Sequence, residues 1–452
     1  MADYFDVLFA GSNSGGSSSL QEKSVSITQN GDSTILPDEG YDGLSKVDVS
    51  VNVSGGGEAP ENDVEFIDYD GTIVYSYTAQ EFLALDAMPA NPTHEGLTAQ
   101  GWNWTLADAK TYVTANGGLV IGQMYITDDG KTRARISIPV GTPSNRCRVV
   151  GSIYIESDEN GNGLTIDYGD GNTSTFTGVG KKTIDHSYTS ADDYIMTISA
   201  DSGTQYLLGG EPKTSTSSSP APFIGTYAST AANKYCCSYL YEIYMGENAD
   251  LTIGAFASSW NLNKITLHNA VSGIPKNTFN SVAQILGLIL PSAITFLGDY
   301  GLGFTLGVKR ISFPKTLSNF GYNHNLNGVS YITLPPAVSS PPATLLNSKY
   351  QLTRVVVPEG VTTISQSMFS YSYGITKFII PSTVTTINAQ AFNYSKAGEI
   401  VFKSSTPPTV SSSNAFGDLA VTCRILVPSG SLAAYTSATN YPNPSTYTYV
   451  EY

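Results

Sequence analysis

The sequence predicts a mainly β, multidomain chain that ends in a repeat solenoid. Short apolar strands alternate with turn-forming residues through most of the 452 residues. From about residue 250 onward, one apolar strand recurs at a nearly constant spacing, which is the signature of a solenoid. Charged residues make up only 13% of the chain, about half of the usual share of roughly 25%. The surface is therefore built largely from hydroxyl, amide and phenol groups.

The charge balance excludes two classes of partner. The 23 Lys and Arg residues stand against 38 Asp and Glu residues, and the net charge is −15. Binding to nucleic acid or to an anionic membrane needs clustered basic residues. The apolar stretch from Val282 to Gly298 is interrupted by Gln284 and Pro291, which argues against a membrane-spanning helix. We expect neither nucleic-acid binding nor membrane insertion, and no cofactor.

The chain divides into six parts. Residues 1–19 combine a short apolar tag with a Gly/Ser-rich linker, and residues 20–57 show alternating strands of a small β module. Residues 60–140 mix strands and helices, residues 145–210 are alternating strand sequence, and residues 211–235 are a linker. The solenoid with its C-terminal cap occupies residues 236–452.

The α+β part shows two helix starts. Thr78 with Glu81, and Thr105 with Asp108, have the spacing of capping boxes. Strands are expected before and after these helices, at residues 64–68, 73–77, 119–127 and 134–138.

The solenoid shows two coincident series. The first marks the end of each strand, with steps of 23, 23, 21, 23, 23, 23 and 24 residues, at His268, Pro291, Pro314, Pro335, Pro358, Pro381, Ser404 and Pro428. The second is an apolar anchor twelve residues before most markers, at Phe256, Phe279, Leu302, Leu346, Phe369, Phe392 and Phe416. One strand and one anchor cannot bury themselves alone, so we expect stacked coils with a parallel strand ladder and a column of aromatic rings.

Three resemblances extend these predictions. Val361-Thr-Thr-Ile364, followed by Met368-Phe369 and Ile379-Ile-Pro381, resembles BspA-like leucine-rich repeats. The Tyr168-Gly-Asp-Gly171 turn with the later His186-Ser-Tyr188 is similar to polycystic-kidney-disease (PKD) domains, which are Ig-like β-sandwiches. The segment around Pro37-Asp-Glu-Gly-Tyr-Asp-Gly43 resembles a β module of bacteriophage tail and fibre proteins.

These resemblances imply a bacteriophage virion protein, a head or tail fibre that displays a solenoid adhesin on the virion surface. The N-terminal tag would dock to other virion proteins through Tyr4, Phe5, Val7, Leu8 and Phe9. The C-terminal domain would bind host-surface or mucus glycans or proteins, and a fibre of this kind implies a homo-oligomer. A bacterial cell-surface adhesin is the alternative, and an enzyme, either a phosphatase or a glycan depolymerase, is the third reading.

The sequence offers no catalytic residue that we would select. Asp68-Tyr-Asp-Gly-Thr72 mimics the nucleophile loop of haloacid dehalogenases, but we expect a β-hairpin turn there. Asp158, Asn160 and Asn162 fit the first half of a calcium loop whose twelfth position is Gly169 rather than Glu, so we predict no metal site.

Aromatic residues supply the candidates for partner contact. Trp102 and Trp104 could stack on glycans or could anchor a core. Tyr371, Tyr373 and Tyr394 follow repeat anchors and are expected on turns, where tyrosine gives contact area with little loss of entropy.

Overall fold

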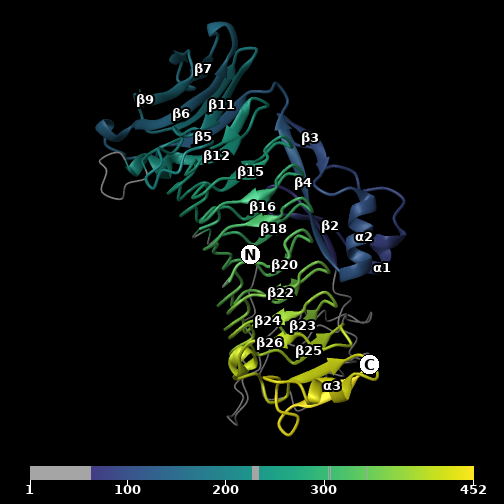
Figure 1. The fold of residues 1–452 in the computed structure, drawn as a ribbon. Coiled ribbons are helices and arrows are strands. Elements are labelled where there is room, and N and C mark those ends of the chain that lie inside the picture. The colour runs from purple at the N-terminus through teal and green to yellow at the C-terminus, as the bar shows by residue number, and fades with distance from the viewer. Residues whose placement is uncertain (1–62, 227–233, 304, 306, 344) are drawn as a thin grey trace, which may run out of the picture. The chain divides into compact units, whose positions relative to one another are not determined.

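The computed structural model describes residues 63–452 apart from 227–233, 304, 306 and 344. The predicted tag with Tyr4, Phe5, Val7, Leu8 and Phe9, the linker after it and the β module at 20–57 lie outside the described residues. The described chain is mainly β and carries the C-terminal solenoid, as the sequence predicts (Figure 1). Its helices are all too short or too polar to cross a membrane.

The α+β unit is built on one four-stranded sheet in the order β2–β1–β4–β3. β1 and β4 run parallel, and the other neighbours are antiparallel. The predicted hairpin at Asp68–Thr72 is confirmed, since the Asp68 N–H donates to the Thr72 carbonyl at 2.9 Å. The strands are β1 (Val64–Ile67), β2 (Ile73–Tyr77), β3 (Leu97–Trp102) and β4 (Leu119–Thr127).

Two helices, α1 (Ala79–Ala84) and α2 (Leu106–Asn116), complete this unit. The Glu81 N–H donates to Thr78 Oγ1 at 3.2 Å, and the Thr78 N–H donates to the Glu81 carboxylate at 2.9 Å. The Asp108 N–H likewise donates to Thr105 Oγ1 at 3.2 Å. Both predicted helix starts are confirmed, because side-chain oxygens satisfy N–H groups that have no partner inside the helix.

Two further sheets share one apolar core. The first has the strand order β14–β12–β5–β10–β7–β8, and the second has the order β13–β11–β6–β9. β13 and β14 are the first strands of the solenoid, and they pair parallel with β11 and β12. The strands are β5 (Thr132–Ser137), β6 (Arg148–Asp158), β7 (Leu164–Asp167), β8 (Thr173–Phe176), β9 (Gly180–Ser187), β10 (Asp193–Ala200), β11 (Thr204–Leu208), β12 (Leu240–Tyr244), β13 (Ala249–Leu251) and β14 (Lys264–Thr266).

Two predicted boundaries are wrong. The strand expected at 134–138 forms as β5, but it pairs with β10 and β12 rather than with the α+β sheet. Part of the expected linker at 211–235 is packed, at residues 220–226: Phe223 and Ile224 are fully buried, and the Phe223 N–H donates to the Ala255 carbonyl at 2.9 Å. An alternating pattern predicts a strand but does not specify its partner.

The solenoid has a front row of strands, which we call the strand face (Figure 1). A strand ends one or two residues before each of the eight predicted markers, and β25 is the strand of the coil that ends at Ser404. The ladder is parallel but not continuous. It is interrupted between β18 and β20, where the step shortens to 21 residues, and also between β14 and β16 and between β21 and β23. Besides β14, the strands are β16 (Gly287–Ile289), β18 (Arg310–Ser312), β20 (Tyr331–Thr333), β21 (Arg354–Val356), β23 (Lys377–Ile380), β25 (Glu399–Phe402) and β27 (Arg424–Val427).

Most coils add a two-residue strand to a second sheet, which occurs in two stretches, β15–β17–β19 and β22–β24–β26. At the C-terminal end, β28 (Thr448–Glu451) pairs with β27, and the short helix α3 (Leu432–Thr436) buries Tyr435 against the last coils. The second-sheet strands are β15 (Gly273–Ile274), β17 (Phe296–Leu297), β19 (Asn319–Phe320), β22 (Thr363–Ile364), β24 (Thr386–Ile387) and β26 (Thr409–Val410).

In each coil, the turn that follows the second-sheet strand is called the corner. Some corner residues, among them Tyr371 and Tyr394, adopt the left-handed backbone conformation. Tyr371 has φ 59° and Tyr394 has φ 57°. This geometry points successive N–H groups along the stack: the Tyr371 N–H donates to the Asn393 carbonyl at 3.0 Å, and the Phe369 N–H donates to the Ala391 carbonyl at 2.8 Å. Each coil is thereby hydrogen-bonded to the next at its corners as well as at its strands.

The predicted aromatic column forms at both ends of the solenoid. The rings of Phe369 and Phe392 lie 5.4 Å apart, as do those of Phe392 and Phe416, and both pairs are stacked. Phe256 and Phe279 form the equivalent pair near the start, at 5.6 Å.

Truncation of one ring in this column tests the importance of the stack. Phe392 is fully buried and stacks on a ring above and a ring below, so Phe392→Ala is expected to reduce the free energy of unfolding by about 3–5 kcal/mol. Tyr322→Ala, at a ring that is 66% exposed, should change it by less than about 0.5 kcal/mol. Chemical denaturation of both variants gives the comparison, and equal effects would contradict the prediction.

Candidate functional site

The α+β unit covers part of the strand face through a row of backbone carbonyls. Three side chains of the unit each donate a hydrogen bond to a carbonyl that lies directly before a marker proline. The pairs are Asn103 Nδ2 to Leu290 at 2.9 Å, Trp104 Nε1 to Phe313 at 2.9 Å, and Tyr112 Oη to Leu334 at 2.7 Å. We call Asn103, Trp104 and Tyr112 the clamp.

The marker prolines explain why these carbonyls accept side-chain donors. In the parallel register of β16 and β18, the Leu290 N–H donates to the Ser312 carbonyl at 3.1 Å, and the Leu290 carbonyl would accept from position 314. Pro314 has no N–H to donate. The same holds for the Leu334 carbonyl and Pro358 in the register of β20 and β21. Asn103 and Tyr112 therefore satisfy carbonyls that the prolines leave without a ladder partner. Trp104 binds the Phe313 carbonyl where the ladder is interrupted between β18 and β20.

Apolar and ionic contacts reinforce the clamp. Ile289, Tyr331 and Val356 of the strand face belong to the same buried cluster as the core of the α+β unit. Glu65 of β1 pairs with Arg310 of β18 at 2.8 Å. Burial raises the pKa of Glu65 above its ordinary value, and the Arg310 guanidinium opposes that shift.

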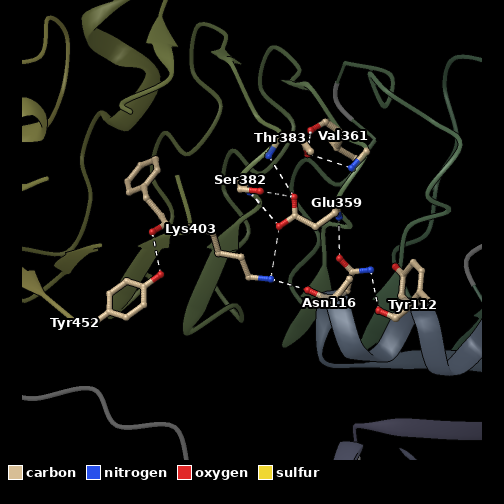
Figure 2. Close-up of polar contacts among 11 residues, drawn as sticks. Tyr112, Asn116, Glu359, Val361, Ser382, Thr383, Lys403 and Tyr452 are labelled. Atoms are coloured by element: carbon tan, nitrogen blue, oxygen red, sulfur yellow. Dashed lines mark hydrogen bonds and ion pairs between the residues drawn. The ribbon is translucent and has the colours of Figure 1, made fainter. Parts of the chain in front are cut away.

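Glu359 joins the end of α2 to three coils, as Figure 2 shows. Its N–H donates to Asn116 Oδ1 at 2.7 Å, and its carboxylate accepts from Ser382 and Thr383 of the next coil. Lys403, one coil further, lies 3.8 Å from the carboxylate and donates to the Ala115 carbonyl of α2 at 2.8 Å. Partial burial raises the pKa of Glu359, but these hydrogen bonds and the ammonium outweigh it, so the pKa lies below its ordinary value.

Trp102 and Trp104 are not available as glycan platforms. They are only 8% and 5% exposed, and both belong to the core of the α+β unit, so the core alternative is the correct one. The Trp102 indole N–H donates to the Pro89 carbonyl at 2.9 Å. The sequence analysis singled out this motif but missed that Asn103, between the two tryptophans, binds the solenoid.

Four exposed tyrosines form one cluster on the corners, which we call the tyrosine cluster: Tyr350, Tyr371, Tyr373 and Tyr394. Tyr371 stacks on Tyr394 at 4.8 Å, Tyr350 stacks on Tyr373 at 5.6 Å, and the edge of Tyr373 meets Tyr371 at 6.3 Å. Their exposed fractions run from 37% to 60%. The structure thus brings the three predicted tyrosines together and adds Tyr350, which sequence reasoning missed although it lies 23 residues before Tyr373.

Tyrosine is an unfavourable choice at two of these corner positions. Tyr371 and Tyr394 hold left-handed backbone, as Ser348 and Asp418 do at the equivalent places in neighbouring coils. A left-handed conformation costs an ordinary residue about 1–2 kcal/mol, whereas Asn, Asp and Gly adopt it more easily. The two side chains remain 37% and 38% exposed and stack on each other rather than entering the core. Stability of the corner therefore does not account for tyrosine at these positions.

The calcium half-loop does not assemble into a metal site. The Asp158 carboxylate accepts from the Gly178 N–H at 2.5 Å, and the Asn162 amide donates to the Ser202 carbonyl at 3.3 Å. The side chain of Asn160 lies outside the described part of the structure. Across the described ranges, no group of three or more His, Cys, Asp or Glu residues could hold a metal ion.

Lys349 is a buried cation at a corner. Its side chain reaches Asn327 Oδ1 at 2.9 Å and Asn325 Oδ1 at 3.4 Å, and burial lowers its pKa to about 8. Serine occupies the equivalent position in the next two coils, at Ser372 and Ser395, where both side chains are fully buried. Lys349 is therefore a local departure from the repeat, beside the shortened coil.

The repeat itself identifies this part of the chain. Residues 235–327 and 288–399 match the BspA type leucine-rich repeat region, in six copies. Residues 235–399 of the solenoid are therefore similar to a BspA type leucine-rich repeat region. No curated protein matches the sequence.

Three solved structures share some similarity with the chain. A leucine-rich repeat protein from Bacteroides ovatus is 14% identical, with 51% of this chain and 73% of that one covered and a TM-score of 0.30. A leucine rich cell surface protein from Faecalibacterium prausnitzii is 12% identical, with coverages of 43% and 80% and a TM-score of 0.21. The pneumococcal vaccine antigen PcpA is 13% identical, with coverages of 47% and 68% and a TM-score of 0.22. At these scores the likenesses carry no argument about function.

The clamp can be tested at Asn103. Its amide donates to Leu290 and Ser312 and accepts from the Gly122 N–H, all within buried surroundings. Asn103→Ala leaves these groups without partners and should reduce the free energy of unfolding by about 1–3 kcal/mol. Asn319→Ala, at an exposed amide, is the control and should have an effect within about 0.5 kcal/mol. Equal losses in the two variants, measured by urea denaturation, would contradict the clamp.

The buried cation can be tested through pH. Because the pKa of Lys349 falls from 10.5 to about 8 on folding, the unfolded chain binds more protons between these values, and stability should rise from pH 8 to 10.5. Lys349→Met removes the buried charge and should stabilise the protein at pH 7 by about 1–3 kcal/mol. The advantage of the variant should shrink as the pH rises, whereas exposed Lys396→Met should show no such trend. A pH-independent difference would refute the assignment.

Proposed function

We propose that this chain is a non-enzymatic attachment protein whose solenoid contacts a host-surface or mucus partner through the tyrosine cluster. The observation that carries the proposal is the pairing of Tyr371 and Tyr394, which hold left-handed backbone while their stacked rings remain exposed. The left-handed backbone belongs to the repeat, but a tyrosine side chain on it does not, and residues held in strained conformations cluster at functional sites. Tyrosine is also the residue that provides large contact area at low entropic cost.

The location of the cluster supports this role. The clamp covers part of the strand face, whereas the tyrosine cluster is exposed. The tyrosine cluster lies on the corners of the coils. Hydrogen bonds between adjacent coils hold these corners above one another, so that the rings stack in pairs. Such preorganisation reduces the entropy that binding has to overcome.

The setting that we propose is the surface of a bacteriophage virion, as a head or tail fibre. The resemblance of the Pro37–Gly43 segment to phage fibre modules supports this setting. The N-terminal tag would dock to other virion proteins, the PKD-like region would serve as a spacer, and the fibre would be a homo-oligomer. Immunogold labelling of intact particles with an antibody to the solenoid tests the setting, and the absence of label from particles would contradict it.

A bacterial cell surface is the second setting. The BspA-type match supports it, since the relatives implied by that resemblance include surface adhesins as well as phage fibre components. The same antibody applied to producing cells separates the two settings. Label on cells without particles would support the cell-surface adhesin.

The contact role itself is tested by replacing the two strained tyrosines. Tyr371→Asn with Tyr394→Asn removes both rings but suits the left-handed backbone, so the free energy of unfolding should stay constant or rise by about 1 kcal/mol. Binding of the labelled protein to intact host cells and to mucin-coated surfaces should fall at least tenfold. Tyr322→Ala, at an exposed ring outside the cluster, should retain binding. Unchanged binding in the double variant would contradict the proposal.

A further inference from the structure

A second surface of the solenoid is hollowed into a groove of about 590 Å³. Its floor is the stretch β15–β17–β19 of the second sheet, where Gly273, Phe296 and Asn319 are direct cross-strand neighbours. Lys213, from the segment that packs before the solenoid, stands on one side. Its volume falls within the range of about 300–1,000 Å³ that small-molecule sites occupy. It is separate from the tyrosine cluster, none of whose residues line it.

The ring of Phe296 lies flat on the floor of the groove because Gly273 beneath it has no side chain. A Cβ atom at Gly273 would lie only 2.0 Å from Cε1 of Phe296, so the ring covers the glycine backbone. Phe296 nevertheless remains 38% exposed. At the second-sheet position that Phe296 holds, the later coils carry threonine, at Thr363, Thr386 and Thr409. The ring is therefore a local feature of this groove and not part of the repeat.

Polar side chains that can still form hydrogen bonds lie around the Phe296 ring. The side chains of Asn319 and Lys276 are exposed and make no hydrogen bond or ion pair with other described residues. Asp299 accepts from the Tyr322 N–H through Oδ1 at 2.9 Å, which leaves Oδ2 for a ligand. An amide, an ammonium and a carboxylate together supply both donors and acceptors.

The charges in the groove largely cancel. Lys213 pairs with Asp250 at 2.8 Å and with Glu156 at 3.2 Å, so its charge is compensated. Lys276 and Asp299 are of opposite sign on the same rim. A strongly charged ligand would therefore gain no net attraction from the groove, and a neutral ligand rich in hydroxyl groups matches it.

We propose that this groove binds a neutral pyranose oligosaccharide. One sugar ring stacks its C–H face on Phe296, and its hydroxyl groups hydrogen-bond to Asn319, Asp299 and Lys276. The proposal rests on the attachment role only for its biological setting, and it names the ligand class at a surface distinct from the tyrosine cluster. Gly273 has the positioning role, because its lack of a side chain lets the ring lie flat.

The test is calorimetric titration of the full chain with neutral trisaccharides of glucose, galactose and N-acetylglucosamine. At least one should bind, and Phe296→Ala should weaken it at least tenfold while Phe296→Trp retains it. Gly273→Ala should weaken it as well, because the added Cβ collides with the ring. Asn319→Ala should give a smaller loss. Thermal unfolding of each variant confirms that it is folded.

The outcomes separate this proposal from the tyrosine cluster. The double variant Tyr371→Asn with Tyr394→Asn should bind the trisaccharide normally, even if its attachment to cells is lost. Failure of all three trisaccharides at millimolar concentration would overturn the groove proposal and leave the tyrosine cluster unaffected. Binding that survives Phe296→Ala, or capture of a peptide in place of the sugars, would overturn it as well.

Discussion

Backbone hydrogen bonds between successive coils are the interaction on which the solenoid depends. They form in the strand ladders and again at the corners, where left-handed residues turn their N–H groups toward the next coil, as at Tyr371 and Tyr394. This second set keeps equivalent residues of neighbouring coils directly above one another. The Phe369, Phe392 and Phe416 rings stack in the core for that reason, and the exposed Tyr371 and Tyr394 rings stack outside it.

The prolines that follow most of the strands end the pairing between coils, and they also leave some backbone carbonyls without a partner. Pro314 and Pro358 cannot donate to the preceding coil, so the Leu290 and Leu334 carbonyls remain open. Asn103 and Tyr112 fill these places, and the α+β unit becomes fixed to the strand face. The repeat thereby creates its own attachment row for a neighbouring unit. The clamp contacts the strand face and leaves the corners and the second sheet uncovered.

Local patterns predicted local structure well. The two capping boxes begin α1 and α2, the apolar triplets before the markers become strands, and the phenylalanine anchors form stacked pairs. The errors concern partners rather than elements. β5 pairs away from its own neighbours in sequence, and Phe223 and Ile224 are buried in a segment predicted as a linker. Such pairings depend on residues far apart in the chain, which no local pattern encodes.

The sequence by itself determined the coil: a 23-residue period, a strand that ends at proline and an apolar anchor follow from hydrophobic pattern and from the missing proline N–H. It also determined the low-charge surface, since corners made of Ser, Thr, Asn and Tyr replace Lys and Glu. Only the tertiary structure decided which surfaces remain free. The contact of Asn103 with Leu290, the flat ring of Phe296 over Gly273, and the four-tyrosine cluster each join residues from different coils or units. Their geometry exists only once the stack has formed.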